Sequence, residues 1–136
     1  MGCTRAGISS PADPYITPLR VGTQQIFVQV VSTDSAKEQG LSGREGLTDK
    51  QGMLFIFDGN DLARPGFWMK DMKFDLDFIW IKNHAVIGIT PNVPHPARVD
   101  ANLPVYYPPE DVDAVLEVNA GWTATHNIKV GDQINL

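Results

Sequence analysis

The feature of the sequence that most restricts the fold is a period-two alternation of charged and apolar residues at positions 72–78. Lys73, Asp75 and Asp77 occupy the odd positions of this segment, and residues 79–81, which follow it, are all apolar. Because successive side chains of a β-strand point to opposite faces, the spacing predicts a strand that passes from a half-exposed region into the core. We expect the three charged side chains on its solvated face.

Other predicted strands are short and are separated by turn-forming residues. We expect about six or seven strands in all, joined mostly by hairpins. This pattern predicts a mainly β protein, a single antiparallel β-sandwich or barrel-like domain with one or two short helices. The further strand segments are residues 24–33, 52–57, 85–89, 113–121 and the end of the chain after Gly131.

A helix and a long loop interrupt the strands. Thr33 or Asp34 can cap a helix of about two turns, which Gly40 or Gly43 would end. Residues 90–110 contain six prolines, which cannot pair in a central strand or continue a helix. We therefore expect a long loop there, and long ordered loops often border binding sites.

Length and composition predict one globular domain with a tail. The chain has 136 residues, of which 43% are hydrophobic and 20% charged, as in ordinary folded proteins. Residues 1–17 are small, polar and proline-containing and lack periodicity, so we expect a flexible N-terminal tail. Residues 18–136 are expected to form the single β domain.

Cys3 is the only cysteine, so an internal disulfide is excluded. A cysteine followed by such a tail is typical of a bacterial lipoprotein, in which the cysteine carries lipid and the tail is a tether. This interpretation predicts an exported protein of the cell envelope or periplasm. The alternative is a tail thiol without a function in a cytoplasmic protein, because the chain contains no apolar signal segment.

The sequence argues against several classes of function. The net charge of −5 and the lack of a basic run disfavour nucleic-acid binding. No apolar run approaches the roughly 20 residues of a transmembrane helix. His84, His95 and His126 lack metal-ligand spacing, so we expect neither a metal nor another cofactor. By default the protein is expected to be a monomer.

Carboxylates are the candidate catalytic groups. Asp75 and Asp77 would lie on one strand face within roughly 7 Å of each other, which would raise one pKa if they were partly buried. A solvated, merely structural face explains the same pattern. Glu117 lies between apolar residues and could be buried, matched to Arg44 or Lys70.

Residues 66–72, "GFWMKDM", have the composition of a ligand-binding surface. Phe67 and Trp68 would supply an aromatic platform beside Lys70 and Asp71, as in sites for small polar or sugar-like ligands. The alternative is a strand buried on both faces, with the charged residues beyond its end.

Four segments, "GLSGREGLTDKQGMLFIFD", "FWMKDMKFDLDFIWI", "VLEVNAG" and "IKVGDQI", together resemble the DUF192 family of bacteria and archaea from about residue 20 to residue 136. The family comprises small, uncharacterised β-rich domains. The resemblance implies an antiparallel β-sandwich-like domain, is compatible with export and implies no activity. Ser42 stands where the family usually has methionine, and Asp71 adds a charge relative to many members. The family's motif positions mark Arg44, Phe67, Trp68, Lys70, Asp71, Asp77 and Glu117.

The sequence is compatible with three functions. The favoured one is a cell-envelope module that binds a small ligand or a partner through Arg44, Phe67, Trp68, Lys70, Asp71 and Glu117. The second is a hydrolase or lyase in which Asp77 and Glu117 act as acid and base, which requires the two carboxyls to open on one cleft. The third is a structural or interaction domain whose motif residues form a buried salt-bridge network.

Overall fold

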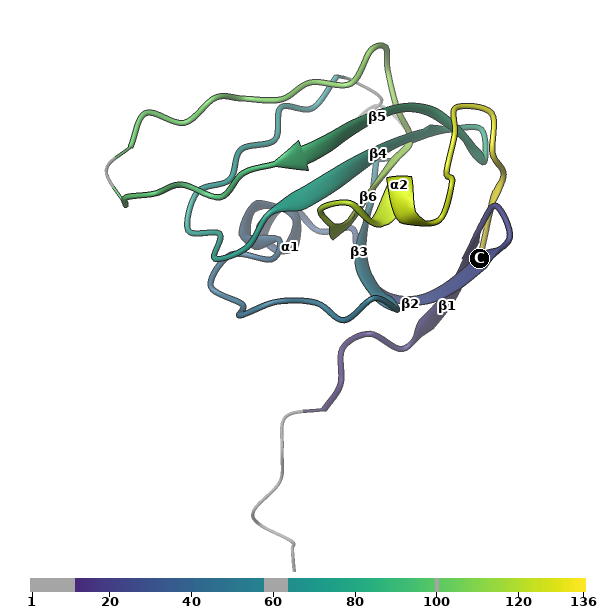
Figure 1. Ribbon diagram of the computed structural model, residues 1–136, viewed down its shortest axis with the longest axis horizontal. Coiled ribbons are helices and arrows are strands. Elements are labelled where there is room, and N and C mark those ends of the chain that lie inside the picture. The colour runs from purple at the N-terminus through teal and green to yellow at the C-terminus, as the bar shows by residue number, and fades with distance from the viewer. Residues whose placement is uncertain (1–11, 58–63, 100) are drawn as a thin grey trace, which may run out of the picture.

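Seven strands form one curled sheet in the structure, a computed structural model that describes residues 12–57, 64–99 and 101–136 (Figure 1). The strand order is β5-β4-β6-β3-β2-β1-β7. The prediction of a mainly β domain with short helices is therefore confirmed. The strands are β1 Thr17–Val21, β2 Gln24–Val31, β3 Gln51–Ile56, β4 Leu76–Lys82, β5 Ala85–Val93, β6 Ala114–Asn119 and β7 Ile134–Asn135, and the helices are α1 Asp34–Gln39 and α2 Trp122–Thr125.

Strand pairing is less sequential than the hairpin pattern predicts. Hairpins join β1 to β2 and β4 to β5, and the second turns at Asn83 and His84, both with positive φ. This geometry is that of a tight type I′ turn. The pair β2–β3 is parallel, and β6 inserts between β3 and β4. A parallel pair needs a crossover, and α1 lies within it.

Two hydrophobic cores pack on opposite faces of β3, β4 and β6. Every strand contributes to the first, the inner core, which therefore lies inside the curl of the sheet. The second, the outer core, includes residues from the segments that follow α1 and precede β4. The inner core contains Leu19, Val21, Ile26, Val28, Leu54, Ile79, Ile81, Val86, Ala114, Leu116, Val118, Trp122, Ile128 and Ile134, and the outer core contains Val31, Leu41, Met53, Phe55, Met69, Met72, Leu76, Phe78, Trp80, Val93, Val112 and Val115.

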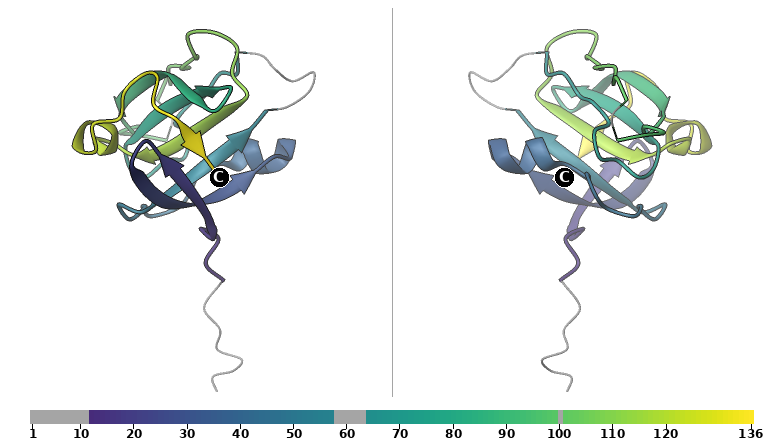
Figure 2. Two further views of the ribbon diagram at one scale, coloured as in Figure 1. Left: turned by 90° about the vertical axis from the view of Figure 1, so that its right-hand side faces the viewer. Right: turned by 90° about the vertical axis from the view of Figure 1, so that its left-hand side faces the viewer.

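The two helices lie on opposite sides of the sheet (Figure 2). Helix α1 begins as predicted, because the Thr33 hydroxyl accepts a hydrogen bond from the Ala36 N–H at 3.2 Å. It ends at Gly40, where φ is 51°. Helix α2 places Trp122 in the inner core. In the described ranges, no helix has the length and apolar character needed to cross a membrane.

The predicted loop at 90–110 is shorter than expected, because β5 continues to Val93. Pro91 therefore lies within a strand. This is tolerated because β5 is at the edge of the sheet order, where a missing N–H leaves no neighbouring strand unpaired.

The expectation of a charged, solvated face at residues 73–77 is wrong at Asp77. Strand β4 begins only at Leu76, so Lys73 and Asp75 precede it and are exposed. Lys73 pairs with the exposed Glu45 at 2.8 Å. Asp75 contacts His95, whose backbone N–H and ring hold the pKa of the Asp75 carboxyl below its usual range. Asp77 has no exposed surface.

Four hydrogen bonds explain the burial of Asp77. One carboxyl oxygen accepts from the backbone N–H groups of Asn92 at 2.8 Å and Gly121 at 3.0 Å. The other accepts from the Thr123 N–H at 3.0 Å and the Thr123 hydroxyl at 2.7 Å. Asn92 and Gly121 have positive φ, so the chain bends at both. The carboxylate satisfies N–H groups that such bends leave without strand partners.

Replacing Asp77 with asparagine should lower the free energy of unfolding by about 3 kcal/mol. Each carboxyl oxygen faces two donors, so an NH₂ group in either position would point its hydrogens at other hydrogens. Urea denaturation monitored by circular dichroism measures the loss. Asp75→Asn is the matched control, and its midpoint should stay close to that of the wild type because Asp75 is exposed. Equal midpoints for the two variants would contradict this structural role for Asp77.

Candidate functional site

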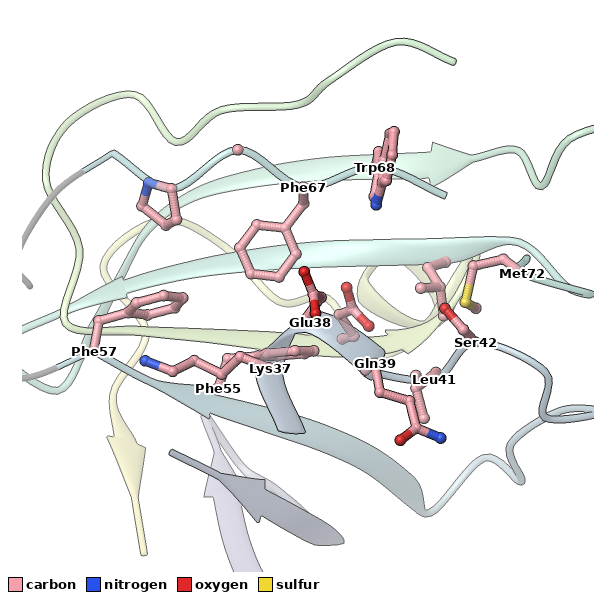
Figure 3. Close-up of a pocket in the computed structure, with 15 residues that line it drawn as sticks. Lys37, Glu38, Gln39, Leu41, Ser42, Phe55, Phe57, Phe67, Trp68 and Met72 are labelled. Atoms are coloured by element: carbon pink, nitrogen blue, oxygen red, sulfur yellow. The ribbon is translucent and has the colours of Figure 1, made fainter. Parts of the chain in front are cut away.

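A pocket of about 220 Å³ opens between α1 and the segment at residues 65–68 (Figure 3). Phe67 and Trp68 lie on one side of it, while residues of α1 and of the turn after α1 lie on the other. Glu38, Gln39 and Trp68 at its border are exposed, so solvent reaches the pocket. Its lining consists of Lys37, Glu38, Gln39, Gly40, Leu41, Ser42, Phe55, Phe57, Pro65, Gly66, Phe67, Trp68, Met72, Leu76 and Glu117.

Phe67 and Trp68 form the aromatic wall of the pocket, and an isolated β-bridge between two extended segments holds this wall in place. Phe67 and Tyr106 exchange backbone hydrogen bonds of 2.8 and 2.7 Å. Alternation in an extended chain directs the Phe67 ring into the outer core and leaves Trp68 54% exposed. A Cβ on Gly66 would lie 2.7 Å from Val105 Cγ1, so glycine permits the close approach of the two segments.

The Phe67 ring joins the pocket wall to the core beneath it. Its centroid lies 5.1 Å from that of Phe55 and 5.7 Å from that of Trp80, both in edge-to-face geometry. The Phe57 ring lies 6.2 Å away, also edge-on. These contacts hold a rigid aromatic surface in place, because each ring is fixed by its neighbours.

Glu117 is a buried carboxyl group in this lining. It lies on β6 between Met53 of β3 and Phe78 of β4, and it is 5% exposed. Among the described residues, no group donates a hydrogen bond or forms an ion pair to its side chain. Burial raises the pKa of Glu117 to about 8. At neutral pH the carboxyl is therefore mostly protonated, with one donor and free acceptor capacity available to a ligand.

The other charged residues of the lining both come from α1. The Lys37 ammonium donates to the Ile56 carbonyl at 2.9 Å and lies 4.2 Å from the centroid of the Phe57 ring. Glu38 is exposed at the border. Neither residue forms an ion pair or a hydrogen bond with Glu117.

The structure brings together three of the six predicted ligand-binding residues, namely Phe67, Trp68 and Glu117. The other three do not line this pocket. Arg44 donates to the Tyr15 hydroxyl at 2.8 Å. The Lys70 ammonium lies 5.5 Å from the centroid of the exposed Trp68 ring, and the Asp71 carbonyl accepts a hydrogen bond from the Gly43 N–H.

Asp77 and Glu117 do not form an acid–base pair. Across β4 and β6, Phe78 is opposite Glu117 and Asp77 is opposite Val118. Directly opposite residues share a face and neighbours along a strand do not, so the two carboxyls point to opposite faces of the sheet. The buried salt bridge expected between Glu117 and Arg44 or Lys70 is also not formed.

Sequence reasoning missed the α1 side of the pocket, from Lys37 to Ser42, and the floor residues Phe55 and Phe57. The helix of a parallel crossover packs on a face of the sheet, so a parallel β2–β3 pair would have predicted that α1 covers the outer core. The sequence did not reveal this parallel pair, because the strand pattern indicated hairpins.

No group of three or more His, Cys, Asp and Glu side chains is placed to hold a metal ion within residues 12–57, 64–99 and 101–136. The three histidines lie in different parts of the fold. His95 contacts Asp75, His126 contacts Asp49 at 3.3 Å, and His84 forms the β4–β5 turn.

Comparisons with known proteins give a family and a fold. The DUF192 family, described as "Uncharacterized ACR", matches residues 17–136. A crystal structure of a protein of unknown function from Novosphingobium aromaticivorans is 29% identical, with a TM-score of 0.77 over 98% of this chain and 97% of that chain. A Sinorhizobium meliloti protein suggested to be a transcription regulator is 28% identical, with a TM-score of 0.75 over 87% and 91%. No curated protein matches the chain.

The raised pKa of Glu117 predicts how stability depends on pH. The carboxyl ionises near 4.5 in the unfolded chain and near 8 in the folded protein, so the folded state holds an extra proton between these values. Its contribution to stability is therefore complete below about pH 4.5 and is lost as the pH rises through 8. From pH 5 to pH 8, the wild type should lose on the order of 3 kcal/mol relative to Glu117→Gln.

Urea denaturation of both proteins at pH 5, 6.5 and 8 tests this difference. The glutamine variant keeps the shape of the side chain and does not titrate, so every other ionisable group cancels in the comparison. A constant difference between wild type and Glu117→Gln across this pH range would show that the Glu117 carboxyl titrates normally.

Proposed function

Because the chain belongs to the DUF192 family, which is described only as uncharacterised, we propose from its own geometry that it is a small-ligand binding module. The site is the pocket between α1 and residues 65–68. One observation carries the proposal: Glu117 is 5% exposed, has no hydrogen-bond partner among the described residues, and lines a pocket with aromatic walls. The pocket is open to solvent, so a ligand that hydrogen-bonds to this carboxyl takes the place of water there.

The size and lining of the pocket suit a small polar ligand, with sugar-like compounds among the candidates. Its volume of about 220 Å³ lies below the roughly 300–1,000 Å³ of pockets for drug-sized ligands, so it admits only a small molecule. Phe67 and Trp68 offer apolar surface to one side of such a ligand, and the Glu117 carboxyl offers a hydrogen bond at the floor. Ser42 adds a hydroxyl to the wall, although this hydroxyl donates to the Lys70 carbonyl at 3.0 Å.

Direct DNA binding is not part of the proposal. The suggestion of a transcription regulator belongs to the Sinorhizobium meliloti protein. The net charge of −5 in this chain opposes contact with phosphate backbones. Acid–base catalysis by Asp77 and Glu117 has no geometric support, because the two side chains lie on opposite faces of the sheet.

A ligand at this site should stabilise the protein, and the gain should depend on Trp68. Thermal denaturation would be followed with monosaccharides, polyols, amino acids and small amines. A compound at one hundred times its dissociation constant should add about 2.7 kcal/mol to the free energy of unfolding. Trp68→Ala should abolish the gain, because the indole lines the pocket.

Phe27→Ala is the matched control for Trp68→Ala. Phe27 is an exposed aromatic residue of β2, 42% exposed against 54% for Trp68, and it does not line the pocket. Ligand stabilisation should survive in this variant. The proposed site is wrong if no compound raises the midpoint, or if both variants lose the gain equally.

The proposal includes a location in the cell envelope, with Cys3 as the lipidated residue. Cys3 lies outside the described residues, and support comes from the sequence of the tail. Labelled palmitate should enter the protein in cells that produce it naturally, and the protein should fractionate with membranes. Cys3→Ser should abolish both. An unlabelled protein in the cytosolic fraction would contradict this location.

A further inference from the structure

We propose that the pocket binds an organic cation, whose ammonium group lies between the Glu117 carboxylate and the aromatic walls. The inference rests on the proposed function, because it assigns a chemical class to the ligand of the same pocket. It stands on three features of the described residues: an unpartnered acceptor, the aromatic surface around it, and the balance of charge in the lining.

The first feature is that the Glu117 side chain has no hydrogen-bond donor or cation beside it among the described residues. The side chain is 5% exposed. A neutral hydroxyl would satisfy a protonated carboxyl with single hydrogen bonds. An ammonium supplies donors and the opposite charge together, and charge-assisted hydrogen bonds are about twice as strong as neutral ones.

The aromatic lining suits the same ligand. Phe55, Phe57, Phe67 and Trp68 line the pocket, and the face of an aromatic ring attracts a cation. Two of these rings already hold ammonium groups of the chain itself, since Lys37 lies over Phe57 at 4.2 Å and Lys70 over Trp68 at 5.5 Å. Phe55 and Phe67 have no cation over them within the described ranges.

The charges of the lining leave room for one more cation. Among the residues that the structure describes, its charged groups are Lys37 and Glu38 on α1 and Glu117 on β6, while β3, β4 and residues 65–68 contribute none. The Lys37 ammonium is already bound by the Ile56 carbonyl and the Phe57 ring. When Glu117 is ionised, the described lining carries two negative charges, on Glu38 and Glu117, and one positive charge, on Lys37. A ligand with one positive charge therefore makes the lining neutral. The net charge of −5 favours its approach.

Cation binding is coupled to the release of a proton. In the free protein, burial raises the pKa of Glu117 to about 8, so the carboxyl carries a proton at pH 7. A neighbouring ammonium favours the ionised form and lowers that pKa. On binding, the Glu117 O–H bond breaks, its proton passes to solvent, and the ligand keeps its own protons and its charge. Affinity should therefore rise about tenfold per pH unit up to about pH 8.

Matched probes separate the class of ligand from the existence of the site. Butylammonium and 1-butanol have the same chain length and differ in the charged group. Their dissociation constants would be measured by amide NMR shifts at pH 6, 7 and 8, where butylammonium stays charged. Butylammonium should bind at least about tenfold more tightly than butanol at pH 8, and its affinity should fall about tenfold per pH unit towards pH 6.

Two variants and one spectroscopic signal complete the test. Glu117→Gln keeps the shape of the side chain, and it should lose both the preference for butylammonium and the pH dependence. Glu110→Gln removes the same charge from an exposed surface pair with Lys82 and should behave as wild type. In wild type, the carboxyl ¹³C signal of Glu117 should titrate at lower pH when butylammonium is present.

The outcomes distinguish the two proposals. If butanol or glucose binds at this pocket as tightly as butylammonium at pH 8, the site stands and the cation assignment is overturned. The same conclusion follows if Glu117→Gln binds butylammonium as tightly as wild type. If neither probe nor any compound of the wider panel binds there, the proposed function fails together with this inference.

Discussion

The fold depends on a carboxylate that receives four hydrogen bonds inside the protein. Asp77 holds a bend of β5 at Asn92 and the entry to α2 at Gly121 and Thr123 against the start of β4. The backbone N–H groups at these positions donate to the Asp77 carboxylate and not to a neighbouring strand. The curl of the sheet around the inner core is thereby fixed at one end by a single residue.

Glu117 shows the opposite solution to the same physical problem, one strand away. Both carboxyls are buried on the central strands, yet Asp77 is surrounded by donors and Glu117 by apolar and aromatic side chains. Donors keep the first carboxyl in a structural role, whereas burial without donors raises the pKa of the second. The difference follows from the two faces of the sheet: the inner face is closed by the chain's own turns, and the outer face is left open beside α1.

Sequence reasoning identified what depends on local spacing and missed what depends on distant pairing. Local patterns predicted every strand segment except β1, and the caps Thr33 or Asp34 and Gly40 or Gly43 predicted α1, because these signals lie within a few residues. The parallel β2–β3 pair and the insertion of β6 rest on contacts between distant segments, which one sequence does not display. For this reason Glu117, Phe67 and Trp68 were predicted as site residues, but the α1 wall opposite them was not. Likewise, the alternation of charged and apolar residues does not show whether a carboxylate is exposed to solvent or, like Asp77, buried and hydrogen-bonded.

The central position of β6 also has a consequence for how the protein is made. The pocket floor combines Phe55 of β3, Leu76 of β4 and Glu117 of β6, and β6 separates the other two strands. While the chain is being synthesised from its N-terminus, β3 and β4 therefore have no common neighbour until residues 114–119 have left the ribosome. Non-local pairing of this kind slows folding. The nascent chain must keep the aromatic residues of the future pocket from aggregating until its last quarter arrives.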